Sequence, residues 1–165
     1  MKTLILMLVL LAATACAPHP STPAGATPTE PVAETAPPTP EFLNAPDAAG
    51  RNLPFSEAVR VGDMLYLSGK LGRVPGELRL AEGGIQPETR QTLTNIKDVL
   101  ERHGSSMDRV VKCTVFLADI DEWASMNEVY KEFFPSNPPA RSALGSSGLA
   151  LDARVEIECI AVAGS

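Results

Sequence analysis

The chain has 165 residues, with 14 Lys or Arg against 20 Asp or Glu, which gives a formal net charge of −6 at neutral pH. Nucleic-acid binding needs a clustered basic face, and the sequence contains no such cluster, so we expect no nucleic-acid partner. Two histidines and three cysteines have no zinc-ligand spacing, and no glycine-rich phosphate loop occurs. We therefore expect neither a metal nor another cofactor.

The first sixteen residues have the pattern of an export signal. An apolar run from Leu4 to Ala13 follows Lys2 and leads through small residues to Cys16. A run of about ten residues is half of what a membrane-spanning helix needs, but it fits a secretory signal. The cysteine that follows resembles the acylated cysteine of the bacterial lipobox, although Ala13 stands where leucine is preferred. We expect a signal peptide over residues 1–15 with acylation at Cys16, and simple secretion is the alternative.

The next segment has the composition of a tether. Nine of the 15 prolines lie between residues 17 and 46, mixed with Thr and Ala, and no Lys or Arg occurs between Lys2 and Arg51. Such a segment buries too little apolar surface to offset its ordering entropy. We expect residues 16–50 to form a disordered spacer that holds a domain, residues 51–165, away from a membrane. Ala17 lacks the aspartate that retains lipoproteins at the inner membrane, which indicates a periplasmic protein anchored to the outer membrane.

The domain has the length of a single folding unit. Residues 55–69 predict two strands around a turn at Gly62-Asp63, and residues 76–81 predict a short third strand. Residues 87–104 predict a helix, with Pro87 at its first position and Gly104 at its end.

The second half of the domain continues the alternation. Residues 109–119 predict a strand with Val111, Cys113, Val115 and Leu117 on one face, and residues 121–134 predict an amphipathic helix. Residues 140–146 predict a short strand and residues 153–163 a long one. Two helices would then cover one face of a mixed sheet, which is an α+β sandwich of two layers. The opposite face carries Glu156 and Glu158, and a second copy of the chain could close over it.

Four further residues leave alternatives open. Cys113 and Cys159 fall on the apolar faces of their strands and could form a disulfide; two buried free thiols are the preferred interpretation. Asn127 lies on the helical face of Trp123, Tyr130 and Phe134, and a buried amide needs a partner. Arg141 follows two prolines and has no acidic neighbour in the sequence, so it is either a surface charge or a cation aimed at an anion.

The sequence blocks, in their order, resemble the Rid (YjgF-type) family. They are LPFSEAV, YLSGKLG, ETRQTLTNIKDVLE, VVKCTVFLADIDEWASMNEVYKEFFP, PPARSALG and RVEIECIAV, and the resemblance covers about residues 51 to 163. The resemblance implies a chorismate-mutase-like fold assembled as a homotrimer with clefts between subunits. It also implies an enzyme that hydrolyses reactive enamines and imines, such as 2-aminoacrylate and 2-iminopropionate, to 2-keto acids and ammonia.

The resemblance assigns roles to individual residues. Arg141 matches the arginine that binds the substrate carboxylate, for which a bidentate guanidinium is well suited. Glu156 matches the glutamate that positions the attacking water, a modest general acid–base task; from the residues alone, Glu158 is an equal candidate. Ser68 and Asn127 match residues that line and support the cleft, and the backbone at Ala143 is expected to contact the substrate.

The sequence departs from the family's usual residues at three positions in or near the expected cleft. Phe55 stands where a cleft tyrosine is usual, Ala143 replaces a frequent cysteine, and Lys70 replaces a common glutamine, which would place a cation near the site. These changes bear on substrate preference more than on reaction class. The alternative function is a non-catalytic protein, a small-carboxylate binder or a holdase, that uses the same cleft.

Overall fold

The computed structural model describes residues 36–45 and 53–164. Its strands form a seven-stranded sheet in the order β1-β2-β3-β7-β5-β6, with β4 paired to β7 beside this path. The strands are β1 (Glu41–Leu43), β2 (Ala58–Val61), β3 (Met64–Leu67), β4 (Lys70–Leu71), β5 (Val110–Leu117), β6 (Ala140–Gly145) and β7 (Val155–Val162). All pairs are antiparallel except β5 with β6, so the sheet is mixed.

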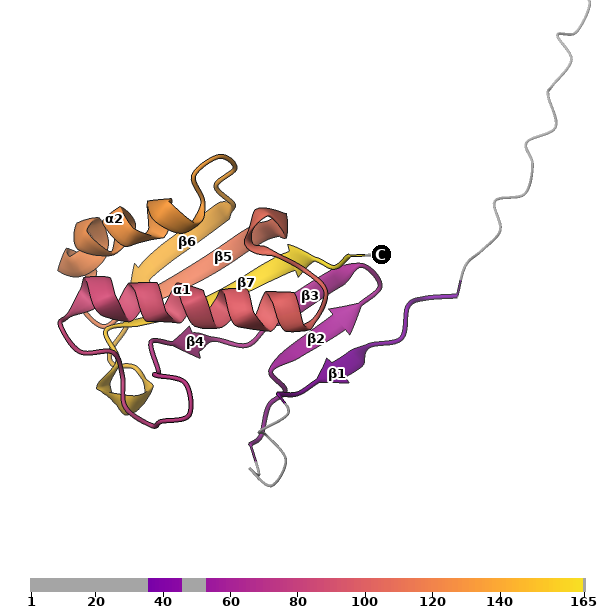
Figure 1. The fold of residues 1–165 in the computed structure, drawn as a ribbon, viewed down its shortest axis with the longest axis horizontal. Coiled ribbons are helices and arrows are strands. Elements are labelled where there is room, and N and C mark those ends of the chain that lie inside the picture. The colour runs from indigo at the N-terminus through magenta and orange to yellow at the C-terminus, as the bar shows by residue number, and fades with distance from the viewer. Residues whose placement is uncertain (1–35, 46–52, 165) are drawn as a thin grey trace, which may run out of the picture. The chain divides into compact units, whose positions relative to one another are not determined.

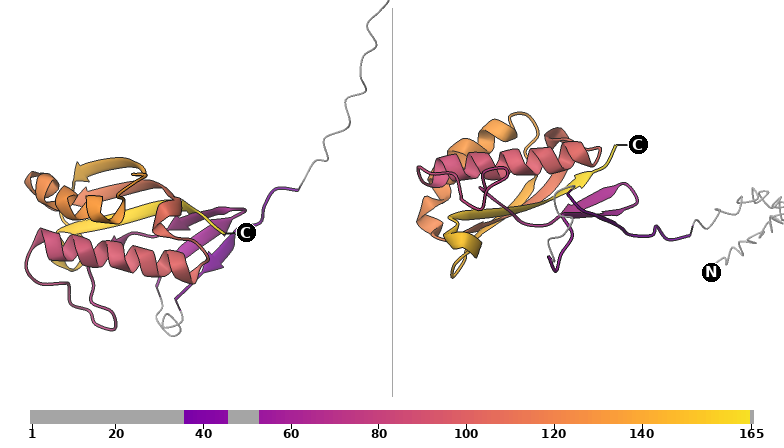
Figure 2. Two further views of the ribbon diagram at one scale, coloured as in Figure 1. Left: turned by 45° about the horizontal axis from the view of Figure 1, so that its top comes forward. Right: turned by 60° about the horizontal axis from the view of Figure 1, so that its bottom comes forward.

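Both helices, α1 (Ile85–Arg102) and α2 (Trp123–Phe133), cover the same face of this sheet (Figures 1 and 2). Four apolar residues of α1 are at most 2% exposed and face the sheet: Leu93, Ile96, Val99 and Leu100. The helix begins two residues before Pro87, and Gly104, with φ of 75°, lies just beyond its end, where a left-handed residue stops a helix. The two-layer α+β arrangement is therefore confirmed.

The core lies between the helices and alternate residues of the central strands. In β7, Val155, Ile157, Cys159 and Ala161 are buried while Glu156 and Glu158 point to the opposite face, as the alternation predicts. In β5 the prediction for Val111 was wrong, because the pairing with β7 shifts between Val110 and Lys112. This bulge turns Val111 outward, where it is 43% exposed.

Two predictions about the strands also need correction. Glu41–Leu43 lies inside the range predicted as a tether, yet it pairs with β2, so the sheet starts ten residues before Arg51. Phe42 and Leu43 have the apolar character that a short edge strand requires, and the proline-rich composition around them obscured it. Residues 76–81 form no strand, and the segment has a single bridge between Arg73 and Leu80. The expectations for residues 1–15, Cys16 and most of the tether lie outside the described residues.

The preferred interpretation of Cys113 and Cys159 as free thiols was wrong. They are directly opposite each other on β5 and β7, with their Cα atoms 4.1 Å apart, and their sulfur atoms form a disulfide. Both side chains are at most 1% exposed. The bond joins the two central strands inside the core.

Candidate active site

Arg141 lies on the edge strand β6 and extends toward the helical layer. It is opposite Cys113 in the parallel β5–β6 pair, which places both side chains on the face that the helices cover. Its guanidinium carbon is 4.5 Å from the ring centre of Tyr130 and 5.9 Å from that of Trp123, both on α2. Stacking on aromatic rings holds the plane of the guanidinium while leaving the N–H groups at its edge available.

The guanidinium of Arg141 has no carboxylate partner among the described residues. No salt bridge or side-chain hydrogen bond forms to it within this part of the chain, although the side chain is only half exposed. Burial raises the pKa of Tyr130 to about 12, with Arg141 opposing the shift, so the phenol below it stays neutral. Arg141, which follows the two prolines, is therefore a cation that aromatic rings orient and that no described carboxylate neutralises.

Asn127 and Ala143 lie near Arg141. Asn127 precedes Tyr130 by one helical turn and is half-buried, so the expected buried amide is at the margin of the apolar face. The buried residues of this helix are Met126, Val129 and Tyr130. Ala143 is two residues beyond Arg141 on the same side of β6 and packs against the core. These three residues belong to one edge of the domain.

Glu156 leaves the sheet on the opposite face and is half-buried beside Gly69. A Cβ atom built on Gly69 would lie 1.9 Å from Oε1 of Glu156, so a larger residue at this position would require the carboxylate to move. Glu158, two residues further along β7, is exposed. The surroundings thus distinguish two glutamates that the alternation pattern left equal.

Ser68 directly precedes Gly69, beside which Glu156 lies, and it is hydrogen-bonded to the segment that contains Phe55. The hydroxyl of Ser68 donates to the carbonyl of Ser56 at 2.7 Å, and its N–H donates to the carbonyl of Glu57 at 3.1 Å. These bonds fasten the end of β3 to the segment that precedes β2. Phe55, in that segment, is 57% exposed, so it offers an apolar surface and no hydroxyl.

Lys70 does not place a cation beside these residues, contrary to the expectation. It is opposite Ile157, on the helical side of the sheet, and its Nζ lies 3.3 Å from Oε1 of Glu57. Arg102 donates to the other oxygen of Glu57 at 2.6 Å, and His103 Nε2 is 3.3 Å from the same oxygen. Burial raises the pKa of Glu57, but Lys70, Arg102 and His103 outweigh it and hold this pKa below its ordinary value.

Sequence reasoning missed two carboxylates, Glu57 and Glu88, because each depends on groups distant in the chain. Glu88, on α1, is 4% exposed and accepts hydrogen bonds from the backbone N–H groups of Arg154 at 2.8 Å and Val155 at 3.3 Å. Burial raises the pKa of Glu88, and the two backbone bonds only partly offset the shift. Both residues fasten elements together; neither contacts Arg141.

One chain does not bring the two groups of expected site residues together. Arg141, Asn127 and Ala143 lie at the β6–α2 edge, whereas Glu156 emerges on the other face of the sheet, and β5 separates their strands.

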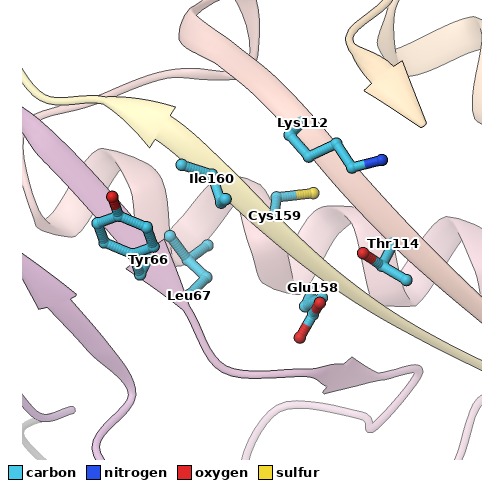
Figure 3. Close-up of a pocket in the computed structure, with 7 residues that line it drawn as sticks. All are labelled: Tyr66, Leu67, Lys112, Thr114, Glu158, Cys159 and Ile160. Carbon is cyan, nitrogen blue, oxygen red and sulfur yellow. The ribbon is translucent and has the colours of Figure 1, made fainter. Parts of the chain in front are cut away.

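Two pockets in the described residues lie away from both groups. The first, of about 160 Å³, crosses the uncovered sheet face between Tyr66, Lys112, Thr114, Glu158 and Ile160 (Figure 3). The second, of about 340 Å³, lies between the C-terminal ends of α1 and α2. Neither includes Arg141 or Glu156.

Two further features are absent from residues 36–45 and 53–164. No three His, Cys, Asp or Glu side chains gather there in an arrangement able to hold a metal ion. No helix in the same ranges has the length and apolar character to cross a membrane.

Comparison with known proteins agrees with this architecture. The sequence profile of the endoribonuclease L-PSP family matches residues 42–163. The 2-iminobutanoate/2-iminopropanoate deaminase of Bos taurus is 46% identical over 120 residues, which is 73% of this chain and 85% of the relative. The human protein of the same name is 42% identical over the same shares of both chains.

Solved structures support the same relationship. The YjgF gene product of E. coli is 30% identical with a TM-score of 0.67, covering 74% of this chain and 98% of its own. E. coli TdcF, solved with bound serine, is 31% identical with a TM-score of 0.65, covering 74% and 94%. The chain therefore belongs to the endoribonuclease L-PSP family, the Rid (YjgF-type) family that its sequence blocks resemble.

Proposed function

We propose that the protein hydrolyses enamine and imine derivatives of 2-amino acids to 2-keto acids and ammonia. The observation that carries this proposal is Arg141, whose guanidinium is stacked on Tyr130 and has no carboxylate partner among the described residues. Such a group suits the carboxylate of a small substrate, which it can bind through two parallel N–H···O bonds. The shared name of the bovine and human relatives, and the serine bound to E. coli TdcF, support the same substrate chemistry.

Glu156 is proposed as the general base. It takes a proton from water while the water oxygen forms a bond to the imine carbon, and that proton then passes to the nitrogen, which gives a carbinolamine. The hydroxyl proton of the carbinolamine then moves to the nitrogen, again through Glu156. The carbon–nitrogen bond breaks, ammonia leaves, and the carbonyl of the 2-keto acid forms. An enamine first gains a proton on carbon and loses one from nitrogen to become the imine. Gly69 leaves the space in which the carboxylate can sit beside the cleft.

The catalytic unit is proposed to be a homotrimer with the site between subunits. Arg141 and Glu156 leave one chain on opposite faces of the sheet, so a site that contains both needs two copies. The uncovered face presents Tyr66, Leu144 and Ile160, the first two 45% and 43% exposed, which gives an apolar surface for a neighbouring copy. Ser68 and Phe55 would complete the wall of the cleft on the Glu156 side, and Asn127 and the backbone of Ala143 the wall on the Arg141 side.

The location of this activity is a separate proposal. The leader and Cys16 support export across the inner membrane and lipid anchorage in the periplasm, at the outer membrane. Labelling cells with a radioactive fatty acid should mark the wild-type chain and leave Cys16→Ala unmarked. An unmarked wild-type chain in the soluble periplasmic fraction would favour simple secretion.

The deciding experiment measures ammonia release from 2-iminopropionate that an amino-acid oxidase generates in situ. The full chain should accelerate release, and Arg141→Ala should lower kcat/KM by about a thousandfold, the loss typical of a charged hydrogen-bonded pair. Arg141→Lys should keep part of the kcat/KM that Arg141→Ala loses, since an ammonium has the charge but lacks the planar fork of a guanidinium. Glu156→Gln should lower kcat with little change in KM.

The non-catalytic alternative predicts a different result. A folded protein that is stabilised by pyruvate, with an increase in Tm that Arg141→Ala abolishes, but that releases no ammonia faster than buffer, would be a carboxylate-binding protein.

A further inference from the structure

Trp123 lies beside Arg141 and is not used by the proposed reaction. Its ring centre is 5.9 Å from the guanidinium carbon, and the side chain is 46% exposed. Tyr130, the other ring beside this guanidinium, is only 5% exposed. The two aromatic residues therefore differ: Tyr130 supports the arginine from within the core, whereas Trp123 presents apolar surface outward.

The apolar surface continues from Trp123 to Ile120. Ile120 is 48% exposed and approaches β6 at Gly145, where a Cβ atom added to the glycine would lie 3.4 Å from that of Ile120. Gly145 and Arg141 lie on the same side of the same strand, since they are four residues apart. Trp123 and Ile120 thus form an apolar rim at the edge that carries Arg141.

We propose that this rim is the subsite for the substrate's side chain, and that the preferred substrates are 2-imino acids with a bulky apolar side chain. This inference rests on the proposed function. A carboxylate bound to a guanidinium through two hydrogen bonds places its carbon about 4 Å from the guanidinium carbon. The side chain begins two bonds beyond that carbon and is then within reach of the indole, whose centre is 5.9 Å from the guanidinium.

The physical basis of the preference is the burial of apolar surface. A methyl group, as in 2-iminopropionate, covers little of the indole, whereas an isobutyl group covers a large part of it. Each additional buried methylene strengthens binding, and hydrophobic pockets discriminate by roughly 10- to 200-fold for such differences. Phe55, which is also exposed and lacks the hydroxyl expected at that position, would add apolar surface from the neighbouring copy.

The test compares 2-iminopropionate with 4-methyl-2-iminopentanoate, generated from alanine and leucine by the same oxidase. The full-length wild type should have a kcat/KM at least tenfold higher for the larger imine. Trp123→Ala should lower the ratio of kcat/KM for the larger imine to that for 2-iminopropionate about tenfold, because an effect exerted through Arg141 would lower both values equally and leave the ratio unchanged. Trp123→Phe should keep most of the preference. Phe42→Ala, which removes a 69% exposed aromatic residue from β1, is the matched control and should change neither value.

Two results would overturn the inference. One is a wild type without preference for the larger imine. The other is an equal loss on both imines in Trp123→Ala, which would mean that Trp123 serves only to hold Arg141. If Trp123→Ala does not fold, Trp123→Leu and Trp123→Phe decide the question in the same way.

A binding measurement separates failure of this inference from failure of the proposed function. Trp123 is the sole tryptophan of the chain, so its fluorescence reports directly on the subsite. If neither imine is hydrolysed, the deaminase proposal fails, and calorimetric titration with pyruvate and 4-methyl-2-oxopentanoate then decides. Tighter binding of the larger keto acid, with a change in fluorescence, supports the subsite; equal affinities, or a fluorescence unaffected by both, overturn it.

Discussion

Arg141 and Glu57 are half-buried charges that the fold treats in opposite ways. Glu57 is surrounded by Lys70, Arg102 and His103, and its carboxylate is fully used within the chain. Arg141 is held by the rings of Tyr130 and Trp123, and its charge meets no described acid. A compensated charge fastens segments together, while an uncompensated one is available to a ligand. The comparison assigns stability to one region and binding to the other.

The first effect, on turnover, concerns the space beside Glu156, the proposed general base. Gly69→Ala should lower kcat/KM for 2-iminopropionate by at least a hundredfold, because the added Cβ would displace the Glu156 carboxylate. Phe42→Ala is the control, since it removes an exposed side chain from β1, far from β6 in the strand order. Steady-state ammonia release from the two variants is the measurement. Full activity in Gly69→Ala would mean that Glu156 is not the base.

The next effect is on the core behind Arg141. Replacing both Cys113 and Cys159 by alanine should lower the free energy of unfolding by about 3–4 kcal/mol, because the disulfide closes a loop of 46 residues. Urea denaturation with and without a reducing agent measures this loss. Since Arg141 lies beside Cys113 on the next strand, KM should also rise more than kcat falls. An unchanged urea midpoint in the reduced wild type would contradict the stabilising role.

A smaller effect is expected at Glu57, on stability and not on turnover. Glu57→Gln should cost about 1–2 kcal/mol, the loss of charged hydrogen bonds. Because the folded pKa of Glu57 is lowered, its contribution is present above the ordinary value of 4.5 and is lost as pH falls through the lower folded pKa. Thermal unfolding from pH 3 to pH 7 should therefore be less pH-dependent in the variant. A large loss of kcat in Glu57→Gln with an unchanged Tm would contradict the assignment of Glu57 to stability.

The smallest effect is expected at Glu88, where the contribution to stability depends on pH in the direction opposite to that of Glu57. Its raised pKa means that its contribution is complete below the ordinary value of 4.5 and is lost as pH rises through the folded pKa. Glu88→Gln keeps an acceptor for the N–H groups of Arg154 and Val155 and removes the proton equilibrium. The variant should therefore lose less stability than the wild type between pH 4 and pH 7. A steeper decline in the variant would contradict this assignment.

The sequence predicted the parts of the molecule that local periodicity determines. The helices, the hairpin around Gly62-Asp63 and the two faces of β7 follow from patterns of 3.6 and 2 residues. Val111 was misplaced because a bulge depends on the partner strand. The Glu57 cluster could not be foreseen, since it joins residues up to 46 positions apart.

The candidate site was predictable to a different extent. The resemblance supplied Arg141, Glu156 and Ser68, and the register then placed Arg141 and Glu156 on opposite faces. The periodicity within a segment does not show which strand it pairs with, so the positions of Arg141 and Glu156 relative to each other could not be predicted. The stacking of Arg141 on Tyr130 was equally hidden, although the helical spacing of Trp123, Asn127 and Tyr130 indicated the face on which it occurs.

The three residues of β1 set a practical limit on any shortened form of the protein. They occupy the hydrogen-bonding edge of β2, at the end of the sheet opposite β6 (Figure 1). A fragment that begins at Arg51 would expose that edge, and open strand edges pair with other chains and promote aggregation. A fragment intended for crystallisation or kinetics should therefore begin no later than Ala36, so that Glu41–Leu43 covers the edge of β2.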